Sequence, residues 1–380
     1  MSWNTKDLMS LRQEFIELAQ KGDLTHRELC RRFTISSKTG YKWLKRYKEE
    51  GTAGLEDRSR RPDHSPYRTS PPLEQAVVEL RRKHPVWGGR KIRACLISAG
   101  YTNVPAHSTI TDILHRHALI DPFSSEAATP WRRFEHERPN DLWQIDFKGH
   151  FETQTARCHP LTLLDDHSRY NLLLHACDRT HTQTVQTLLS SVFERYGIPK
   201  RINADNGSPW GTPSKHGHGI SKLTIWLIRL GIQVSHSRPR HPQTNGKLER
   251  FHRSLEAEVL RGRYFSDIKS VQTSFDKWQH VYNQQRPHEA LDMEVPIKRY
   301  QSSQRAFVGF LEPIEYTPDD VVVYPGWNGE TRFKGIRFKV PNELKDLPIA
   351  LRPNANEDGL YDVYFCHQRF MKLDLRKNKT

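Results

Sequence analysis

Residues 142–147 read Leu-Trp-Gln-Ile-Asp-Phe, and this stretch decides the fold. Apolar and polar residues alternate along it, which is typical of a β-strand with one face in a hydrophobic core. A carboxylate inside such a strand costs free energy unless a cation or a metal ion compensates its charge. Asp146 is therefore the first candidate for a functional residue.

Strands and helices alternate after this segment. Three strands in an antiparallel meander come first, and single strands and helices then follow in turn. This pattern predicts an α/β core, residues 123–300, with a mixed five-stranded sheet and helices on both faces. The expected strands are residues 142–147, 161–165, 170–176, 201–204 and 232–235, and the expected helices are residues 182–196, 222–230 and 245–261.

Two more carboxylates fall where elements of this core begin or end. Asp205 follows the strand 201–204, and Glu249 lies in the first turns of the helix 245–261. Carboxylate oxygens are the ligands that Mg²⁺ prefers, and two ions about 4 Å apart can clamp both oxygens of a phosphoryl displacement. We therefore expect Asp146, Asp205 and Glu249 to be catalytic and metal-binding. The five cysteines are scattered without a CxxC pair, so no thiolate set competes for this role.

The first 122 residues read as two helical domains. In residues 1–53, Thr25 and Glu28 form a capping box before a second helix, and Ser36 or Ser37 caps a third that runs to about Glu50. This is a helix-turn-helix pattern, which residues 71–122 repeat; a basic linker, residues 54–70, separates the two domains. A plain helical bundle with a solvated basic face is the alternative. The predicted DNA contacts of this region are Ser37, Lys38, Thr39, Lys42, Lys45, Arg46, Arg58, Arg60, Arg61, Ser108, Thr109 and Arg116.

The charge balance favours a polyanionic partner. The chain of 380 residues carries a formal charge of +15, and its first 120 residues hold 22 Lys and Arg against 13 Asp and Glu. A basic surface kept for solubility is the alternative, but the excess is concentrated where the helix-turn-helix patterns lie. No apolar run approaches a membrane span and the start leads into no signal-peptide stretch, so we expect a cytoplasmic protein that does not bind membranes.

Residues 301–380 show a different pattern of short strands separated by turns. Among them, residues 321–324, 333–338 and 361–365 are rich in β-branched and aromatic residues. Several short strands of this kind predict a small C-terminal β-barrel.

Five motifs in order carry a resemblance to a known family. They are Trp-Gln-Ile-Asp at 143–146, Asp-Asp-His-Ser-Arg-Tyr at 165–170, Ala-Asp-Asn-Gly at 204–207, His-Pro-Gln-Thr-Asn-Gly-Lys-Leu-Glu-Arg at 241–250, and Tyr-Asn with Arg-Pro-His at 282–288. Together they resemble the integrase catalytic core of DDE transposases. With the helix-turn-helix pattern and the basic segment 54–62, the chain is similar to bacterial insertion-sequence family 481.

The resemblance implies a ribonuclease H-like core and a DNA transposase. Such an enzyme binds terminal inverted repeats, frees a 3′-OH at the transposon end and joins it to target DNA. Asp146, Asp205 and Glu249 fall at the family's catalytic positions, which hold two Mg²⁺ ions, with Mn²⁺ as a substitute. The implied partners are double-stranded DNA and further copies of the chain, as a homodimer or larger oligomer on DNA at the bacterial nucleoid.

Two other functions stay open. One is a catalytically silent, transposase-derived, sequence-specific DNA-binding protein, and the other is a ribonuclease H-like nuclease that only hydrolyses. The intact carboxylate set favours an active enzyme, and the two helix-turn-helix patterns favour recognition of a defined DNA end.

The region around Glu249 supplies further expectations. The 43 residues between Asp205 and Glu249 exceed the retroviral-type spacing, which predicts an inserted surface loop at 208–219. Asp165 and Asp166 are expected to be structural, with Arg169 as a partner. The predicted DNA contacts here are Gln243, Asn245, Lys247, Arg250 and Arg253, of which Arg253 shares a helix face with Glu249.

Overall fold

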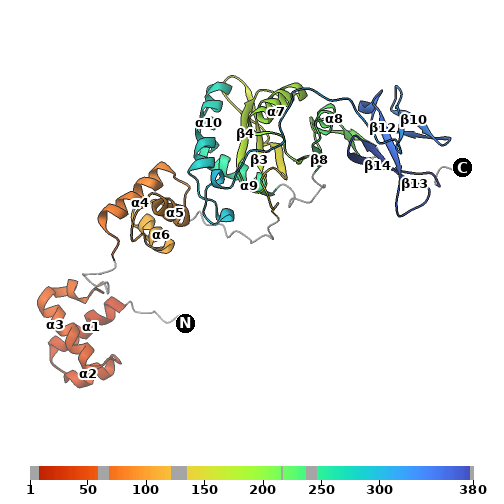
Figure 1. Cartoon of the computed structure of the whole chain (residues 1–380). Helices are drawn as coiled ribbons and strands as arrows, with labels where there is room; N and C mark the ends of the chain where they lie inside the picture. The colour runs from red at the N-terminus through yellow and green to blue at the C-terminus, as the bar shows by residue number, and fades with distance from the viewer. Residues whose placement is uncertain (1–7, 59–67, 121–134, 215–216, 237–245, 377–380) are drawn as a thin grey trace. The chain divides into compact units, whose positions relative to one another are not determined.

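The computed structural model describes residues 8–58, 68–120, 135–214, 217–236 and 246–376, although side chains are described only outside residues 8 and 212–219. The chain divides into two compact units, Met1–Arg68 and Thr69–Thr380. Figure 1 labels the helices and strands of both units, and each unit is described by itself. Among the described residues, no helix has the length and apolar character needed to cross a membrane.

The first unit is a small helical domain. Thr25 caps its second helix and forms the predicted capping box with Glu28, and Ser36 caps its third helix. The core contains Trp43 and also the fully buried Leu55, so the packed part of this unit continues past residue 53. Its elements are α1 (Leu8–Lys21), α2 (His26–Arg32), α3 (Ser37–Glu50) and the 3₁₀ helix Gly51–Leu55.

The close contact between α2 and α3 depends on Gly40. A Cβ at Gly40 would lie 2.6 Å from Sγ of Cys30, so only glycine allows this approach. Gly40, Trp43 and Tyr47 form the inner stripe of α3. Tyr41 lies beside this stripe rather than in it, so its side chain is 62% exposed and stacks on His26.

The second unit begins with the second predicted helix-turn-helix domain. Trp87 is buried at the turn between the first two helices, and Ile92 and Ile110 are fully buried between them and the third helix. The three helices are α4 (Pro71–Lys83), α5 (Gly89–Ser98) and α6 (His107–Arg116).

A mixed sheet forms the centre of the second unit, and it contains all five predicted strands. The strand β1 pairs antiparallel with β3 on one side and parallel with β5 on the other. The prediction of five strands was incomplete, because a short sixth strand, β2, pairs two residues with the start of β3. The strands are β1 (Trp143–Phe147), β2 (Phe151–Glu152), β3 (Arg157–Asp165), β4 (Asn171–Cys177), β5 (Arg201–Ala204) and β8 (Gln233–His236).

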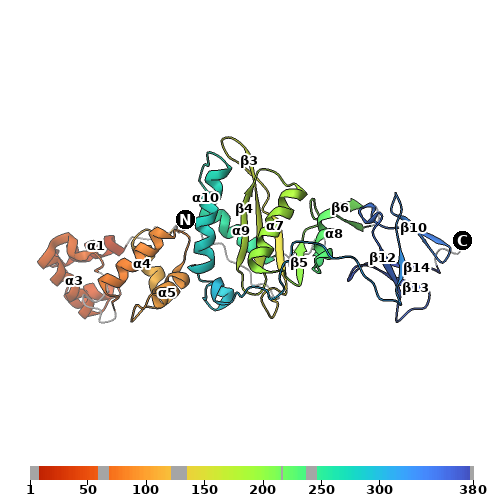
Figure 2. The same ribbon diagram turned by 45° about the horizontal axis from the view of Figure 1, so that its top comes forward.

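Helices cover both faces of this sheet (Figure 2). Trp143 and Ile145 of β1 face one core with α7 (Thr182–Tyr196) and α8 (Lys222–Arg229). Leu164 of β3 faces a second core with α9 and α10. The helix α9 spans Gly246–Leu255 and continues as a π-helical turn, Glu256–Leu260, and α10 spans Ile268–Gln284. The alternation of side chains along β1 therefore determines which residues face α9.

Side-chain amides form hydrogen bonds with backbone groups at both edges of the sheet. Gln272 of α10 accepts a hydrogen bond from Ala176 N at 2.8 Å, and its amide nitrogen donates to the carbonyl of Leu174 at 3.1 Å. At the other edge, Gln368 accepts from Val234 N at 2.8 Å and donates to Val234 O at 2.9 Å. These amides occupy backbone groups that would otherwise be open to another strand.

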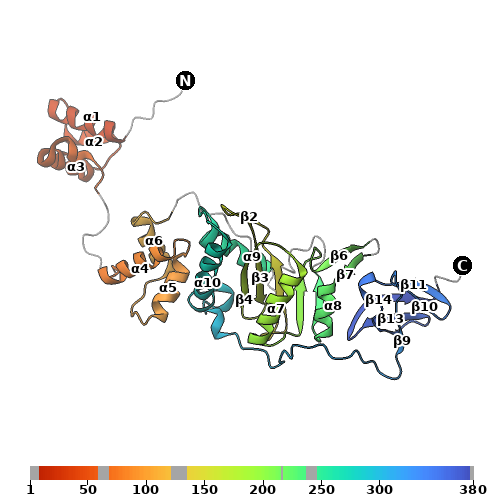
Figure 3. The same cartoon turned by 90° about the horizontal axis from the view of Figure 1, so that it is seen from above.

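The predicted insertion is a structured element rather than a plain loop. The strands β6 (Gly211–Ser214) and β7 (Gly217–Ile220) pair as an antiparallel hairpin beside α8 (Figure 3). Trp210 before the hairpin is 2% exposed, and its carbonyl accepts hydrogen bonds from Ser221 at 3.0 Å and Thr224 at 2.7 Å. These contacts anchor the insertion to the start of α8.

The C-terminal region contains an open four-stranded antiparallel sheet in the order β14-β13-β12-β9 and a separate hairpin. Residues 333–338, predicted as one strand, contain the turn of that hairpin because Lys334 and Gly335 both have positive φ. Closure into a barrel stays a prediction, since the strand pairings among the described residues form no closed ring. The strands are β9 (Val321–Val323), β10 (Glu330–Phe333), β11 (Ile336–Lys339), β12 (Ile349–Pro353), β13 (Leu360–Phe365) and β14 (Gln368–Asp374).

Candidate active site

Asp146 in β1 and Asp205 directly after β5 lie at the same level of two neighbouring parallel strands. In the pairing of β1 with β5, Gln144 is opposite Asn203. Two residues further along each chain stand Asp146 and Asp205. Side chains two residues apart in a strand share a face, and neighbouring strands are about 4.8 Å apart. The sheet register therefore brings the first two predicted carboxylates together.

The helix α9 brings Glu249 to the same face of the sheet. Thr162 is the cross-strand partner of Asp146, and its hydroxyl lies 2.9 Å from the carbonyl of Asp146 and 2.8 Å from Nε2 of His252. Glu249 is three residues before His252 and therefore shares a face of α9 with it. Glu249 is thus on the side of the sheet that carries Asp146, rather than on the opposite side.

The electrostatics of Asp146 reflect this proximity. Burial, together with the negative charges of Asp205 and Glu249, raises the pKa of Asp146 to about 7, while a hydrogen bond from the backbone of Phe147 opposes the rise. Burial, with a smaller effect from Lys148, lowers the pKa of His252 to about 4, so its ring is neutral at pH 7. The site therefore holds surplus negative charge that His252 does not balance.

The described residues contain no ready-made metal site of three or more His, Cys, Asp or Glu side chains. The oxygen-only set of Asp146, Asp205 and Glu249 nevertheless suits a hard divalent cation. Such a cation would compensate the negative charge of Asp146, whose burial and repulsion by Asp205 and Glu249 raise its pKa. The set fits Mg²⁺ in chemical type, and the three side chains approach one another without closing around one point.

Asp166 fixes the start of α9 against the sheet. It forms an ion pair with Lys247, accepts a hydrogen bond from Gln144 at 2.9 Å, and is only 1% exposed. Lys247, predicted to contact DNA, is thus engaged by a buried carboxylate two residues before Glu249. This pair was not anticipated from the sequence, which predicted a structural role for Asp166 with Arg169 as its partner.

Asp165 has a structural role, as predicted, but a different set of partners. It accepts hydrogen bonds from the backbone of Asn140 at 2.8 Å and from the hydroxyl of Ser168 at 2.6 Å. Arg169, expected to pair with Asp165 or Asp166, instead donates to Glu135 at 3.2 Å. The tight turn between β3 and β4 explains this, since Arg169 has a φ of 61°.

The other predicted DNA contacts differ in their exposure and in their partners. Ser37, Lys38, Lys42 and Lys45 are exposed on α3, and Ser108 and Thr109 are exposed on α6. Arg58 and Arg116 are partly exposed and pair with Glu50 and Glu74, and Arg250 pairs with Glu289 at 3.9 Å. Thr39 and Arg46 are half-buried on α3, and Arg253 is exposed on α9. Arg60, Arg61, Gln243 and Asn245 lie outside the described residues.

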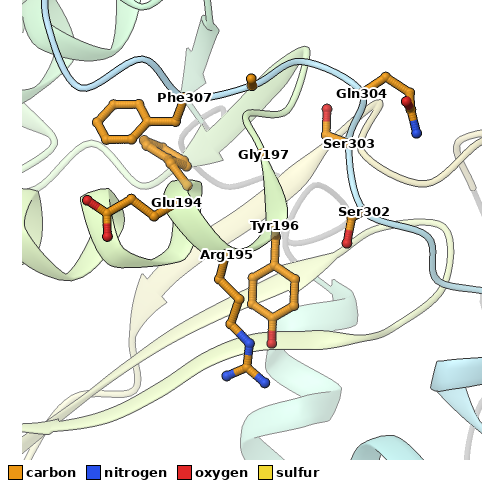
Figure 4. Close-up of a pocket in the computed structure, with 10 residues that line it drawn as sticks. Glu194, Arg195, Tyr196, Gly197, Ser302, Ser303, Gln304 and Phe307 are labelled. Atoms are coloured by element: carbon orange, nitrogen blue, oxygen red, sulfur yellow. The ribbon is translucent and has the colours of Figure 1, made fainter.

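A shallow pocket of about 320 Å³ lies between the end of α7 and residues 302–307 (Figure 4). Gly197 allows this approach, because a Cβ there would stand 2.7 Å from the carbonyl oxygens of Ser303 and Arg305. None of the predicted site residues lines the pocket, so it is not assigned to the carboxylate site.

Several family models match parts of the chain. Two family models described as Integrase core domain match residues 136–242 and 230–296. A Helix-turn-helix domain matches residues 11–62, and a Homeodomain-like domain matches residues 39–114. The C-terminal domain of IS481 family transposases matches residues 326–380. In the order of these matched domains, the chain is similar to IS481 family transposases. Its integrase core is ribonuclease H-like, with the mixed sheet described above, and helix-turn-helix domains precede it.

Curated relatives come from other insertion elements. The IS476 uncharacterized 39.2 kDa protein of Xanthomonas euvesicatoria is 23% identical over 237 residues, covering 61% of this chain and 65% of that protein. The IS407 uncharacterized 31.7 kDa protein of Burkholderia multivorans is 24% identical over 158 residues, covering 42% and 54%. The chain thus spans less than two thirds of these relatives. The HTLV-2 integrase catalytic core domain, solved in complex with magnesium, matches with 14% identity and a TM-score of 0.32, covering 43% of this chain and 99% of that structure.

Proposed function

We propose that the chain is a DDE transposase that cuts the end of an insertion sequence and joins it to target DNA. The observation that supports this most strongly is the register of β1 and β5, which aligns Asp146 with Asp205 inside an integrase core. Glu249 completes the proposed catalytic set from α9, on the same face of the sheet.

Asp146, Asp205 and Glu249 would hold two Mg²⁺ ions, with Mn²⁺ as a substitute. The bound ions would supply positive charge and Lewis acidity at the scissile phosphate. The ion pair of Asp166 with Lys247 and the contact of Thr162 with His252 hold the first turns of α9 against the sheet. These contacts keep Glu249 near the other two carboxylates before substrate arrives.

The reaction consists of two in-line displacements at phosphorus. In the first, water attacks the phosphodiester at the transposon end, the P–O3′ bond breaks, and a 3′-OH and a 5′-phosphate result. In the second, that 3′-OH attacks a target phosphodiester, and the target's own 3′-oxygen leaves with a proton. Neither step needs a covalent bond to the protein, so the contribution of the chain is positioning and charge compensation.

The helix-turn-helix domains would bind the terminal inverted repeats, with α3 of the first unit presenting its exposed lysines to the DNA. Two ends must be processed together, so we propose a homodimer or larger oligomer on DNA. The reaction would take place at the nucleoid in the bacterial cytoplasm.

The test uses the full chain and a labelled duplex that carries the end of the element encoding it. With Mg²⁺, the wild type should release a 3′-OH end and form a joined product. Asp205→Asn should form neither product while retaining DNA binding. Cleavage without joining would favour the nuclease, and binding without either reaction by the wild type would favour the silent DNA-binding protein.

A further inference from the structure

The helix α5 of the second helix-turn-helix domain meets the catalytic core through its first two turns. Cys95 Sγ lies 3.9 Å from the carbonyl of Gln285, and Arg90 donates to Glu289 at 3.2 Å. Lys91 is one turn before Cys95 and therefore lies on the face of α5 that is turned toward the core. This contact region is called the α5 junction below; it comprises Arg90, Lys91, Arg250, Glu258, Arg286, His288 and Glu289.

The two carboxylates of the α5 junction are fully occupied. Glu258 accepts from Nε of Arg286 at 2.9 Å with one oxygen and from Nε1 of Trp278 at 2.8 Å with the other. One oxygen of Glu289 pairs with Arg90 at 3.2 Å, and the other pairs with Arg250 at 3.9 Å. Every carboxylate oxygen at the junction thus already has a cationic or N–H partner.

Lys91 is left without an acidic partner. It is half-buried and makes no recorded hydrogen bond or ion pair with any residue that the structure describes. Burial and the charge of Arg286 lower the pKa of Lys91 to about 8, although the negative charges of Glu258 and Glu289 act in the opposite direction. Four cations and two carboxylates leave the junction with a surplus of two positive charges. A half-buried ammonium group is costly unless a counter-charge is supplied.

Two further features of the junction indicate a missing anion. Arg90 and Lys91 lie in the first turn of α5, where there is no acidic residue and no side-chain cap. Cations are unfavourable at this end of a helix, and anions are favourable there. In addition, Nε2 of the buried His288 has no hydrogen-bond partner among the described residues. Burial lowers the pKa of this ring, and the nearby charges of Arg286 and Lys91 act in the same direction.

We propose that Lys91 binds a backbone phosphate of the transposon-end DNA at the α5 junction. This rests on the proposed function and adds a DNA contact in the second helix-turn-helix domain, beside the helix that carries Glu249. The phosphate supplies the negative charge that the junction lacks. Arg250, which joins the junction through Glu289, is the neighbour of Glu249 in the chain. A strand held at Lys91 is thereby positioned next to the helix that carries Glu249.

The experiment measures binding of the duplex end without catalysis, using the full chain with Asp205→Asn and no divalent metal. Adding Lys91→Gln should weaken DNA binding roughly tenfold. It should also reduce the slope of log affinity against log salt by the amount that corresponds to about one phosphate contact. Lys269→Gln removes one charge from an exposed position on α10 and is the matched control, which should change neither quantity to that extent. In addition, single phosphates of the duplex can be ethylated one at a time. Ethylation at one position should weaken binding by the chain that retains Lys91 and should not weaken binding by the Lys91→Gln variant.

The thermal stability of a Lys91 variant distinguishes a phosphate contact by Lys91 from a purely structural role of this residue. Lys91→Met should leave the thermal midpoint of the free chain unchanged or raise it, because burial and the charge of Arg286 outweigh the attraction of Glu258 and Glu289 for the ammonium group. A lowered thermal midpoint of Lys91→Met would overturn the proposal. The proposal would also be overturned if Lys91→Gln had the same DNA affinity and the same salt slope as the control. Inorganic phosphate that raises the midpoint only when Lys91 is present, with no change in DNA affinity, would also overturn it in favour of a free-anion site.

The outcomes also distinguish this proposal from the proposed function. Loss of DNA binding in Lys91→Gln with no strand transfer by the wild type would contradict the transposase reaction and support the phosphate contact. Strand transfer by the wild type with unaltered binding by Lys91→Gln would contradict the phosphate contact alone.

Discussion

Asp146 lies two residues beyond Gln144, and Asp205 lies two residues beyond Asn203, the residue paired with Gln144 on the neighbouring parallel strand. Their side chains therefore share one face and one level of the sheet. Burial and the charge of Asp205 raise the pKa of Asp146 to about 7. Burial and mutual repulsion of these carboxylates therefore cost the metal-free chain stability, and a bound cation would offset this cost.

This coupling predicts how the stability of the metal-free chain depends on pH. The folded pKa of Asp146 is above the unfolded value near 4, so its stabilising contribution is complete below pH 4 and is lost as the pH rises through 7. Between pH 5 and pH 8, the wild type should lose roughly 2 kcal/mol of unfolding free energy relative to Asp146→Asn. Urea unfolding in EDTA at the two pH values measures this difference. A difference that is constant or grows with pH would contradict the assignment.

A second prediction concerns the pair of Lys247 with Asp166. Lys247→Met leaves the 1%-exposed carboxylate of Asp166 without its cation and should cost about 3 kcal/mol of unfolding free energy. Lys222→Met, at the exposed first position of α8, is the control and should cost less than about 0.5 kcal/mol. Denaturant unfolding compares the two. Equal, small effects would show that Lys247 is free to contact DNA instead.

The approach of residues 303–305 to Gly197 gives a third prediction. Gly197→Ala combines a φ of 73° with contacts of 2.7 Å to two carbonyl oxygens. Gly262→Ala has a similar φ of 71° but open space around the new methyl group. The first substitution should therefore destabilise the chain by about 2 kcal/mol more than the second. Thermal unfolding of both variants tests this, and equal losses would mean that the close approach does not exist in solution.

A fourth prediction concerns α3. Lys42 is exposed on this helix, with its ammonium group 4.6 Å from the ring centre of Trp43. Lys42→Ala should reduce the slope of log affinity against log salt by about 0.9 for end DNA. Lys21→Ala, at the exposed end of α1, should leave the slope unchanged. If both variants retain the wild-type slope, then Lys42 makes no phosphate contact.

The alternation of residues 142–147 was sufficient to predict β1, because burial of one face imposes a period of two. The capping box of Thr25 with Glu28 likewise fixed the start of α2 from local chemistry alone. The strand β2 was missed because its pairing with β3 covers only two residues and leaves no periodicity to detect.

The contacts that hold the site together could not be predicted in the same way. Lys247 and Asp166 are 81 residues apart, and Thr162 and His252 are 90 apart, so only the fold brings them together. The sequence indicated the three carboxylates by their positions at strand and helix ends. It held no signal for Lys91, whose lack of an acidic partner depends on how Arg90, Arg250 and Arg286 are paired.

The most direct test of the central claim is a count of bound Mn²⁺ by electron paramagnetic resonance, on the full chain with end DNA. The wild type should bind two ions per chain, and Glu249→Gln should lose at least one of them while its DNA affinity is retained. Binding of the same number of ions with the same affinity by Glu249→Gln would show that Glu249 is not a metal ligand, and would contradict the account.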